Sequence, residues 1–124
     1  MNVVGVGTDL VEVQRIRTAL ARTPSLERKL FTPAEQTYAQ RAADPAQRYA
    51  VRFAAKEAAM KALGVGVGAV GWHDIEVIRT VTGAPELAIT GRAAQLADEL
   101  GVGGWKVSLS HTTLSAQAVV LALG

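Results

Sequence analysis

The sequence predicts an α+β fold in which an antiparallel sheet packs against one long central helix. Residues from about Ala46 to Leu63 have helical periodicity with apolar side chains on both sides. Two strand-like runs, 105–111 and 116–123, lie close enough in the chain to form an antiparallel hairpin. The remaining strand-like segments are distant in sequence, so the pattern differs from the regular strand–helix alternation of a parallel sheet.

Length and composition predict one domain spanning residues 1–124, small enough that oligomerisation would help bury apolar surface. A hydrophobic fraction of 49% and a charged fraction of 19% exclude a disordered chain. The absence of cysteine excludes disulfides, thiolate metal sites and cysteine nucleophiles. No apolar run reaches the length of a membrane span and no signal segment is visible, so we expect a cytoplasmic protein.

The N-terminal residues predict a strand followed by a helix. Residues 3–6 are rich in β-branched valine, which favours a short buried strand. Asp9 stands three residues before Glu12, the spacing of a capping box at a helix start. The helix that follows has Ile16 on its apolar side and should end before Pro24.

Two further helices are predicted in the first half of the chain. Thr32 is a candidate cap with Pro33 in the first turn, and Asp44-Pro45 interrupts the chain again. The central helix then runs from about Ala46 to Leu63 and is closed by Gly64. Its large residues form one stripe and its small residues the opposite face (Tyr49, Phe53, Met60 and Leu63 against Val51, Ala54, Ala55, Ala58, Ala59 and Ala62).

A glycine-rich connection leads into the second half of the chain. Residues 75–78 and 87–89 predict two strands joined by a turn at Gly83-Ala84-Pro85. Thr90 is expected to cap a helix that ends near Gly101, before the C-terminal hairpin begins.

The charged residues of the central helix require a structural or functional explanation, because that helix is apolar on both sides. Glu57 and Lys61 are four apart and therefore neighbours, which fits an ordinary intrahelical ion pair. The same two residues also fit a metal ligand and a phosphate-binding cation. Arg52 and Lys56 lie on another side, where they would either bind anions or extend to solvent.

Asp9 and the first helix each permit two interpretations. Asp9 is either a helix cap or, with Glu57, part of a site for a hard cation such as Mg²⁺, although periodicity does not show that the two meet. The basic residues of and after the first helix form either a solvated face or a surface that steers an acidic partner (Arg15, Arg17, Arg22, Arg28 and Lys29).

Several familiar motifs are absent or incomplete. Gly5 and Gly7 begin a dinucleotide fingerprint, but Leu10 stands where its third glycine would fall, and no P-loop sequence occurs. No nucleophile elbow surrounds a serine. His111 would either bind a phosphate or satisfy a turn, and His73 is interpreted as an ordinary loop residue.

Two segments, Gly5–Glu12 and Arg52–Gly64, closely resemble the two signatures of the holo-acyl-carrier-protein synthases, the short type of 4′-phosphopantetheinyl transferase. The resemblance continues through Gly83-Ala84-Pro85 and Ser108–Thr112 and covers essentially the whole chain. One position departs from it, because Val65 stands between two glycines where the family commonly has threonine.

The resemblance implies a 4′-phosphopantetheinyl transferase fold assembled as a homotrimer, with active sites in clefts between subunits. It implies that Asp9 and Glu57 ligate Mg²⁺ together with the pyrophosphate of coenzyme A, and that Lys61 contacts phosphate. A helix carrying Arg15 and Arg22 would face an acidic acyl carrier protein. Four residues would hold the coenzyme A nucleotide (Arg52, Gly64, Pro85 and His111).

The implied reaction transfers 4′-phosphopantetheine from coenzyme A to a serine of apo-acyl carrier protein and releases adenosine 3′,5′-bisphosphate. Lys61 would stabilise the leaving group, and Glu57, directly or through a bound water, is the candidate acceptor of the serine proton. Two alternatives are a non-catalytic adaptor that docks acidic helices, and a transferase that uses another nucleotide donor. The sequence does not distinguish a fatty-acid carrier from a polyketide carrier.

Overall fold

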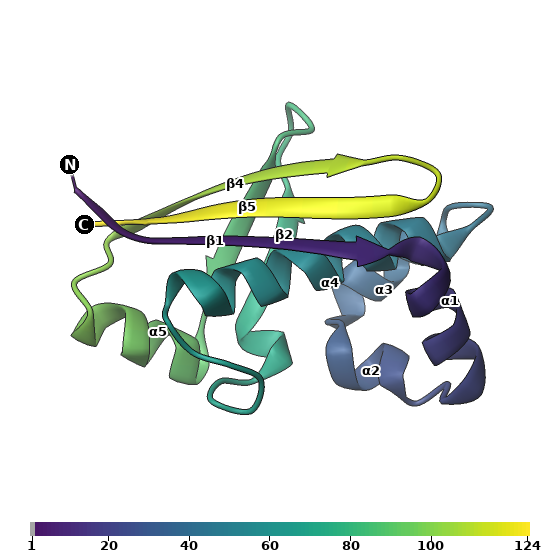
Figure 1. The fold of residues 1–124 in the computed structure, drawn as a ribbon, viewed down its shortest axis with the longest axis horizontal. Helices are drawn as coiled ribbons and strands as arrows, with labels where there is room; N and C mark the ends of the chain where they lie inside the picture. Colours follow the sequence, from purple (N-terminus) through teal and green to yellow (C-terminus); the bar gives the residue numbers. More distant parts are fainter. Residues whose placement is uncertain (1) are drawn as a thin grey trace.

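The computed structural model describes residues 2–124 and confirms the predicted α+β architecture (Figure 1). In chain order the elements are β1 (Val3–Glu12), α1 (Val13–Arg22), α2 (Leu26–Leu30), α3 (Pro33–Gln40), α4 (Pro45–Ala62), the 3₁₀ turn η1 (Trp72–Asp74), β2 (Ile75–Arg79), β3 (Pro85–Ile89), α5 (Gly91–Glu99), β4 (Gly104–His111) and β5 (Ser115–Leu123).

The main sheet is antiparallel with the strand order β1–β5–β4, so the first and last strands of the chain are neighbours. Strands β2 and β3 form a separate antiparallel hairpin, as the turn at residues 83–85 predicts. Figure 1 shows α4 lying along one face of the main sheet, with α1, α2 and α3 near one end of the molecule and α5 near the other. The predicted antiparallel sheet packed on a long central helix is therefore confirmed.

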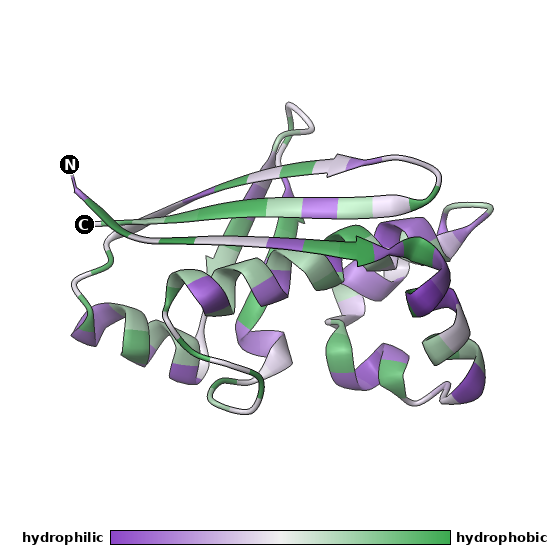
Figure 2. Cartoon of the chain, in the orientation of Figure 1, coloured by the Kyte–Doolittle hydropathy of each residue, from purple (hydrophilic) through white to green (hydrophobic). Residues whose placement is uncertain are grey.

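Helix α4 forms the centre of the core because its two apolar sides face different partners. Its alanine-rich side contacts β1 and β5, and Ala54, Ala55 and Ala58 are fully buried there. Tyr49 and Met60, from its stripe of large residues, are also buried. Figure 2 shows hydrophobic colouring along most of α4 and of the sheet, interrupted by a few hydrophilic positions.

Strand β1 lies directly against the backbone of α4 at two glycines. A Cβ atom added to Gly5 would lie 1.9 Å from the carbonyl oxygen of Ala62, and one added to Gly7 would lie 1.7 Å from that of Ala58. No real Cβ atom tolerates such distances, so only glycine lets the strand rest directly on the helix backbone. The two glycines of the N-terminal segment are therefore packing residues.

The predicted capping box at Asp9 and Glu12 is wrong. Strand β1 continues through Asp9 to Glu12, and α1 begins only at Val13 without a side-chain cap. Pairing with β5 explains the longer strand, because the ladder extends as far as Glu12 opposite Ser115. The predicted end of this helix before Pro24 is confirmed, whereas the short helix α2 was not predicted.

The other predicted helix boundaries agree closely with the structure. Thr32 and Glu35 form a reciprocal capping box at the start of α3, with Pro33 in its first turn. Gly64 follows α4 with a φ angle of +76°, a left-handed conformation that favours glycine. Thr90 precedes α5, but its side chain makes no capping bond, and the Asp74 carboxylate accepts the hydrogen bond from the Ala93 N–H instead.

Within residues 2–124, none of the helices combines the length and the hydropathy that crossing a bilayer requires.

We predict that Gly7→Ala destabilises the fold by about 3 kcal/mol or more, because the added methyl group forces β1 away from α4. Equilibrium denaturation by urea measures the loss. Gly103→Ala is the matched control, since a Cβ atom at Gly103 meets nothing within 4 Å. Equal stability of the two variants would show that the strand–helix contact is not the constraint described above.

Candidate active site

The contact between β1 and α4 brings the predicted charged residues together. Asp9 lies two residues beyond Gly7, on the same face of β1, and so points toward α4. The Lys61 Nζ atom lies 3.2 Å from the Asp9 Oδ1 atom and donates a hydrogen bond of 3.0 Å to the Thr8 carbonyl oxygen. The predicted Glu57–Lys61 ion pair is wrong, because in the described chain Lys61 pairs with Asp9 instead.

Glu57 is a half-buried carboxylate whose charge Lys61 compensates only in part. Burial raises the pKa of Glu57, and the negative charge of Asp9 raises it further. The positive charges of Lys61 and Arg15 act in the opposite direction and lower the pKa of Glu57. A carboxylate whose ionisation is disfavoured by a neighbouring carboxylate is typical of acid–base and cation-binding sites. We call this group of residues the acid centre (Asp9, Glu57 and Lys61).

The donor set of the acid centre fits a hard divalent cation. Carboxylate oxygens suit Mg²⁺, which usually takes one or two protein carboxylates and completes its shell with water and substrate phosphates. Within residues 2–124 no cluster of three or more histidine, cysteine or acidic residues gathers in a metal-binding arrangement. Such a two-carboxylate site suits a cation that is shared with a phosphate substrate better than a closed structural metal site.

Lys56 serves neither of its two predicted roles. Its side chain is fully buried and makes an ion pair of 2.8 Å with Glu35. The same ammonium group donates hydrogen bonds to the carbonyl oxygens of Trp72 and Ile75, so all three of its protons are used. Lys56 is therefore a structural residue that ties α4 to the segment before β2.

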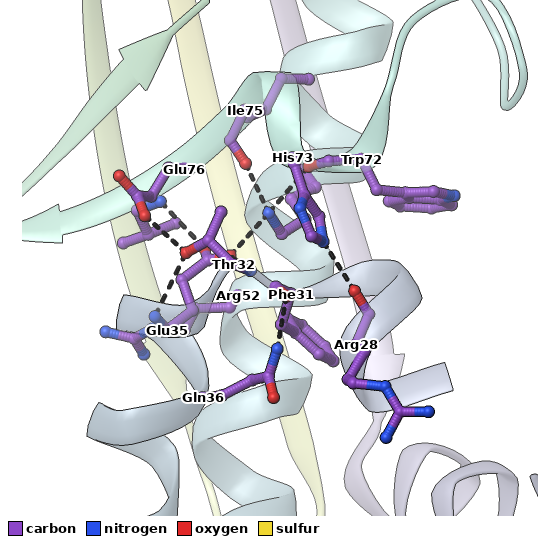
Figure 3. A network of polar contacts seen from close by, with 12 residues as sticks. Arg28, Phe31, Thr32, Glu35, Gln36, Arg52, Trp72, His73, Ile75 and Glu76 are labelled. Carbon is purple, nitrogen blue, oxygen red and sulfur yellow. Dashed lines mark hydrogen bonds and ion pairs between the residues drawn. The ribbon is translucent and has the colours of Figure 1, made fainter. Parts of the chain in front are cut away.

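The carboxylate of Glu35 completes this buried network, which Figure 3 shows between α3, α4 and β2. Its oxygens accept hydrogen bonds from the backbone N–H groups of Thr32 and Val77, at 2.9 Å and 3.0 Å. The Thr32 hydroxyl in turn donates to Glu76. His73 lies beside this network in the 3₁₀ turn η1 and not in the predicted loop, with its Nε2 atom 2.7 Å from the Arg28 carbonyl oxygen.

A cavity of about 500 Å³ lies between the first half of α4, the β2–β3 hairpin and the end of β4. Three of the four residues that the resemblance assigns to coenzyme A line this cavity together (Arg52, Pro85 and His111). The fourth, Gly64, lies at the other end of α4, beyond Lys61. The structure thus places Gly64 nearer to the acid centre than to the cavity.

The cavity is strongly basic. Arg48, Arg52 and Arg79 line it with His111, and the lining contains no acidic residue. Among residues 2–124 none of these arginines forms an ion pair with a carboxylate. Arg52 is only 5% exposed, its Nε atom is without a hydrogen-bond partner in the described chain, and burial lowers the pKa of its side chain. An anionic ligand in the cavity would compensate the positive charge of this arginine.

The basic cavity and the acid centre lie on opposite sides of α4. Arg52 and Lys61 are nine residues apart, which corresponds to about two and a half turns and a rotation of about 180°. One chain therefore presents two separate half-sites, each with part of the groups that a long phosphorylated ligand would contact.

The predicted docking surface lies next to the acid centre. Arg15 and Arg22 on α1 line a shallow groove beside Leu10, whose side chain is 68% exposed. Arg15 is close enough to lower the pKa of Glu57. A partner bound in this groove would thus be held near the two carboxylates.

Sequence reasoning missed the tyrosine and two of the arginines that line the cavity: Tyr38, Arg48 and Arg79. The spacing of Arg48 and Arg52, four apart on one helix, was a usable signal for a paired basic site. Tyr38 and Arg79 come from α3 and β2, and only the folded chain brings them to the same wall.

A family model of the 4′-phosphopantetheinyl transferase superfamily matches residues 5–119 of this chain. A holo-[acyl-carrier-protein] synthase from Moorella thermoacetica is 48% identical over 115 residues, covering 93% of this chain and 90% of the relative.

Among solved structures, a holo-[acyl-carrier-protein] synthase from Neisseria meningitidis superimposes with a TM-score of 0.90 at 30% identity, covering 99% of this chain and 100% of that one. A holo-(acyl-carrier-protein) synthase from Bacillus anthracis, in complex with coenzyme A (3′,5′-ADP), gives a TM-score of 0.81 at 32% identity, covering 98% of each chain.

Proposed function

The chain belongs to the 4′-phosphopantetheinyl transferase superfamily, and from that premise we propose that it acts as a holo-acyl-carrier-protein synthase. It transfers 4′-phosphopantetheine from coenzyme A to a serine of apo-acyl carrier protein and releases adenosine 3′,5′-bisphosphate. The observation that carries this proposal is the acid centre, where β1 holds Asp9 against Lys61 and beside Glu57.

Asp9 and Glu57 would hold a Mg²⁺ ion, since they are paired carboxylates and the charge of Asp9 raises the pKa of Glu57. When bound, the cation offsets negative charge on the pyrophosphate of coenzyme A. Lys61 adds a fixed positive charge on the same side of α4 and stabilises the leaving phosphate.

In the transfer itself, the serine oxygen attacks the β-phosphate and the bond to adenosine 3′,5′-bisphosphate breaks. The serine proton must leave as the new phosphate ester forms. Glu57 would accept it, because burial and the charge of Asp9 raise the pKa of Glu57 in the direction that makes a carboxylate a better base.

The basic cavity would hold the nucleotide of the donor. Arg52 supplies positive charge and His111 a polar ring for its phosphates, and Pro85 supplies an apolar wall. Gly64, in a left-handed conformation one turn beyond Lys61, would let the pantetheine end pass close to the backbone.

We propose that the complete site forms between two copies of the chain in a homotrimer. The acid centre and the basic cavity lie on opposite sides of α4, so one ligand reaches both more readily across a subunit boundary. An apolar surface is available for assembly on β1, the edge strand of the main sheet. Its outward side chains away from the α1 groove are strongly exposed (Val3 58% and Val6 59%).

The acyl carrier protein would dock on α1. Arg15 and Arg22 offer positive charge to an acidic helix, and exposed Leu10 offers an apolar contact beside them. Because Arg15 acts electrostatically on Glu57, a carrier bound here would deliver its serine near the acid centre.

We expect the purified chain to add the mass of one phosphopantetheine unit to apo-acyl carrier protein when coenzyme A and Mg²⁺ are present. Asp9→Ala and Glu57→Ala should each abolish the mass gain while leaving thermal unfolding cooperative, because each removes half of the carboxylate pair. Mass spectrometry of the carrier protein is the measurement. Normal turnover by both variants would refute the acid centre. Carrier binding without transfer would favour a non-catalytic adaptor. Transfer from another nucleotide donor would favour a different transferase.

Mixed assemblies test the shared site. Co-expression of Glu57→Ala with Arg52→Ala chains, followed by purification through two different tags, should give about a third of wild-type activity, since one subunit boundary in each mixed trimer keeps both intact half-sites. Co-expression of Asp9→Ala with Glu57→Ala is the matched control and should stay inactive, because both changes fall in the same half-site. If neither pair recovers activity, the site is contained within one chain.

Charge reversal tests the docking surface. Arg22→Glu should raise the KM for acyl carrier protein about 10-fold at low salt, with a smaller effect at high salt as the charges are screened. Arg22 is chosen because Arg15 influences Glu57 directly. Lys106→Glu, an exposed change on β4, is the control. An equal effect from both substitutions would point to overall charge and not to α1.

A further inference from the structure

The arginines of the basic cavity are gathered around one aromatic ring. Tyr38 lies near the end of α3, and three guanidinium groups surround its ring. Their central carbons lie 4.1 Å (Arg48), 4.3 Å (Arg52) and 5.0 Å (Arg79) from the ring centroid. These distances are within the range of cation–π contacts.

Hydrogen bonds to Tyr38 fix two of the three arginines further. The Arg79 Nη1 atom donates to the Tyr38 hydroxyl oxygen at 2.7 Å, and the Arg48 Nη1 atom donates to the Tyr38 carbonyl oxygen at 2.7 Å. The ring contacts all three arginines, the hydroxyl also orients Arg79, and the carbonyl oxygen also orients Arg48.

This arrangement concentrates positive charge that the described chain does not neutralise. Burial lowers the pKa of Arg52, and repulsion from Arg48 and Arg79 lowers it further. The attraction of the ring offsets part of that repulsion. Long arginine side chains otherwise lose conformational entropy when they bind an anion, and holding them in place beforehand removes that cost.

We propose that Tyr38 is a positioning residue for the donor: it holds Arg48, Arg52 and Arg79 together as a preformed clamp for a phosphate group of the nucleotide. This inference rests on the proposed function, because it assigns the nucleotide of coenzyme A to the basic cavity. Tyr38 itself takes no part in the chemical step, which belongs to the acid centre on the other side of α4.

Steady-state kinetics with coenzyme A separate binding from chemistry. Tyr38→Leu removes the ring and the hydroxyl, and should raise the KM for coenzyme A about 20-fold while kcat changes less than about 2-fold. Tyr38→Phe keeps the ring and loses only the bond to Arg79, so its KM should rise only about 3-fold. Thr37→Ala, an exposed change on the same helix, is the control and should leave both constants unchanged.

Calorimetric titration with adenosine 3′,5′-bisphosphate distinguishes failure of this inference from failure of the proposed function. If the wild-type chain binds neither this nucleotide nor coenzyme A, the proposed function fails. If it binds and Tyr38→Leu binds equally well, only the positioning role fails. A fall in kcat without a change in KM, or equal KM values for the Phe and Leu variants, also overturns the role. Because Tyr38→Phe preserves the ring, it gives a valid reading even if Tyr38→Leu unfolds.

Discussion

The fold depends on the direct contact of β1 with the backbone of α4. Gly5 and Gly7 face the carbonyl groups of Ala62 and Ala58, at distances that admit no side chain on the strand. Small residues on both elements let the strand and the helix approach as closely as their backbones allow. Because side chains alternate along a strand, Asp9 then faces the same helix and meets Lys61 beside Glu57. One packing constraint therefore forms the core and also assembles the acid centre.

Three charged residues near the centre of α4 have different surroundings, and this decides their roles. Lys56 is fully buried and satisfied by Glu35 and two carbonyl groups, so it stabilises the fold and has no capacity left for a ligand. The charges of Glu57 and Arg52 are only partly neutralised. Glu57 lies beside the Asp9 carboxylate, and Arg52 lies among other arginines. Incomplete neutralisation of this kind is typical of groups that bind a ligand or react with one.

The helical turn of α4 places its basic residues and its acid centre on opposite sides of the helix. Arg52 lies on the wall of the basic cavity, and Lys61 lies on the opposite side with Asp9. The same fold leaves apolar side chains exposed on β1 at the edge of the sheet. The proposed trimer connects these features, because assembly would cover the edge strand and bring complementary half-sites together. Tyr38 then acts within one half-site, where it offsets repulsion among the arginines before a ligand arrives.

The sequence alone determined the parts of this protein that depend on local patterns. The bounds of α4, the helix cap at Thr32 and the C-terminal hairpin follow from periodicity and turn chemistry. Tertiary structure decided the rest: Asp9 fits a helix cap by spacing, but pairing with β5 keeps it in a strand. Lys56 and Lys61 look alike on one helix, yet one is buried against Glu35 and the other reaches Asp9, because partners from distant segments set their surroundings. Spacing along a chain records only neighbours on the same element, whereas a site is made of residues that different elements bring together.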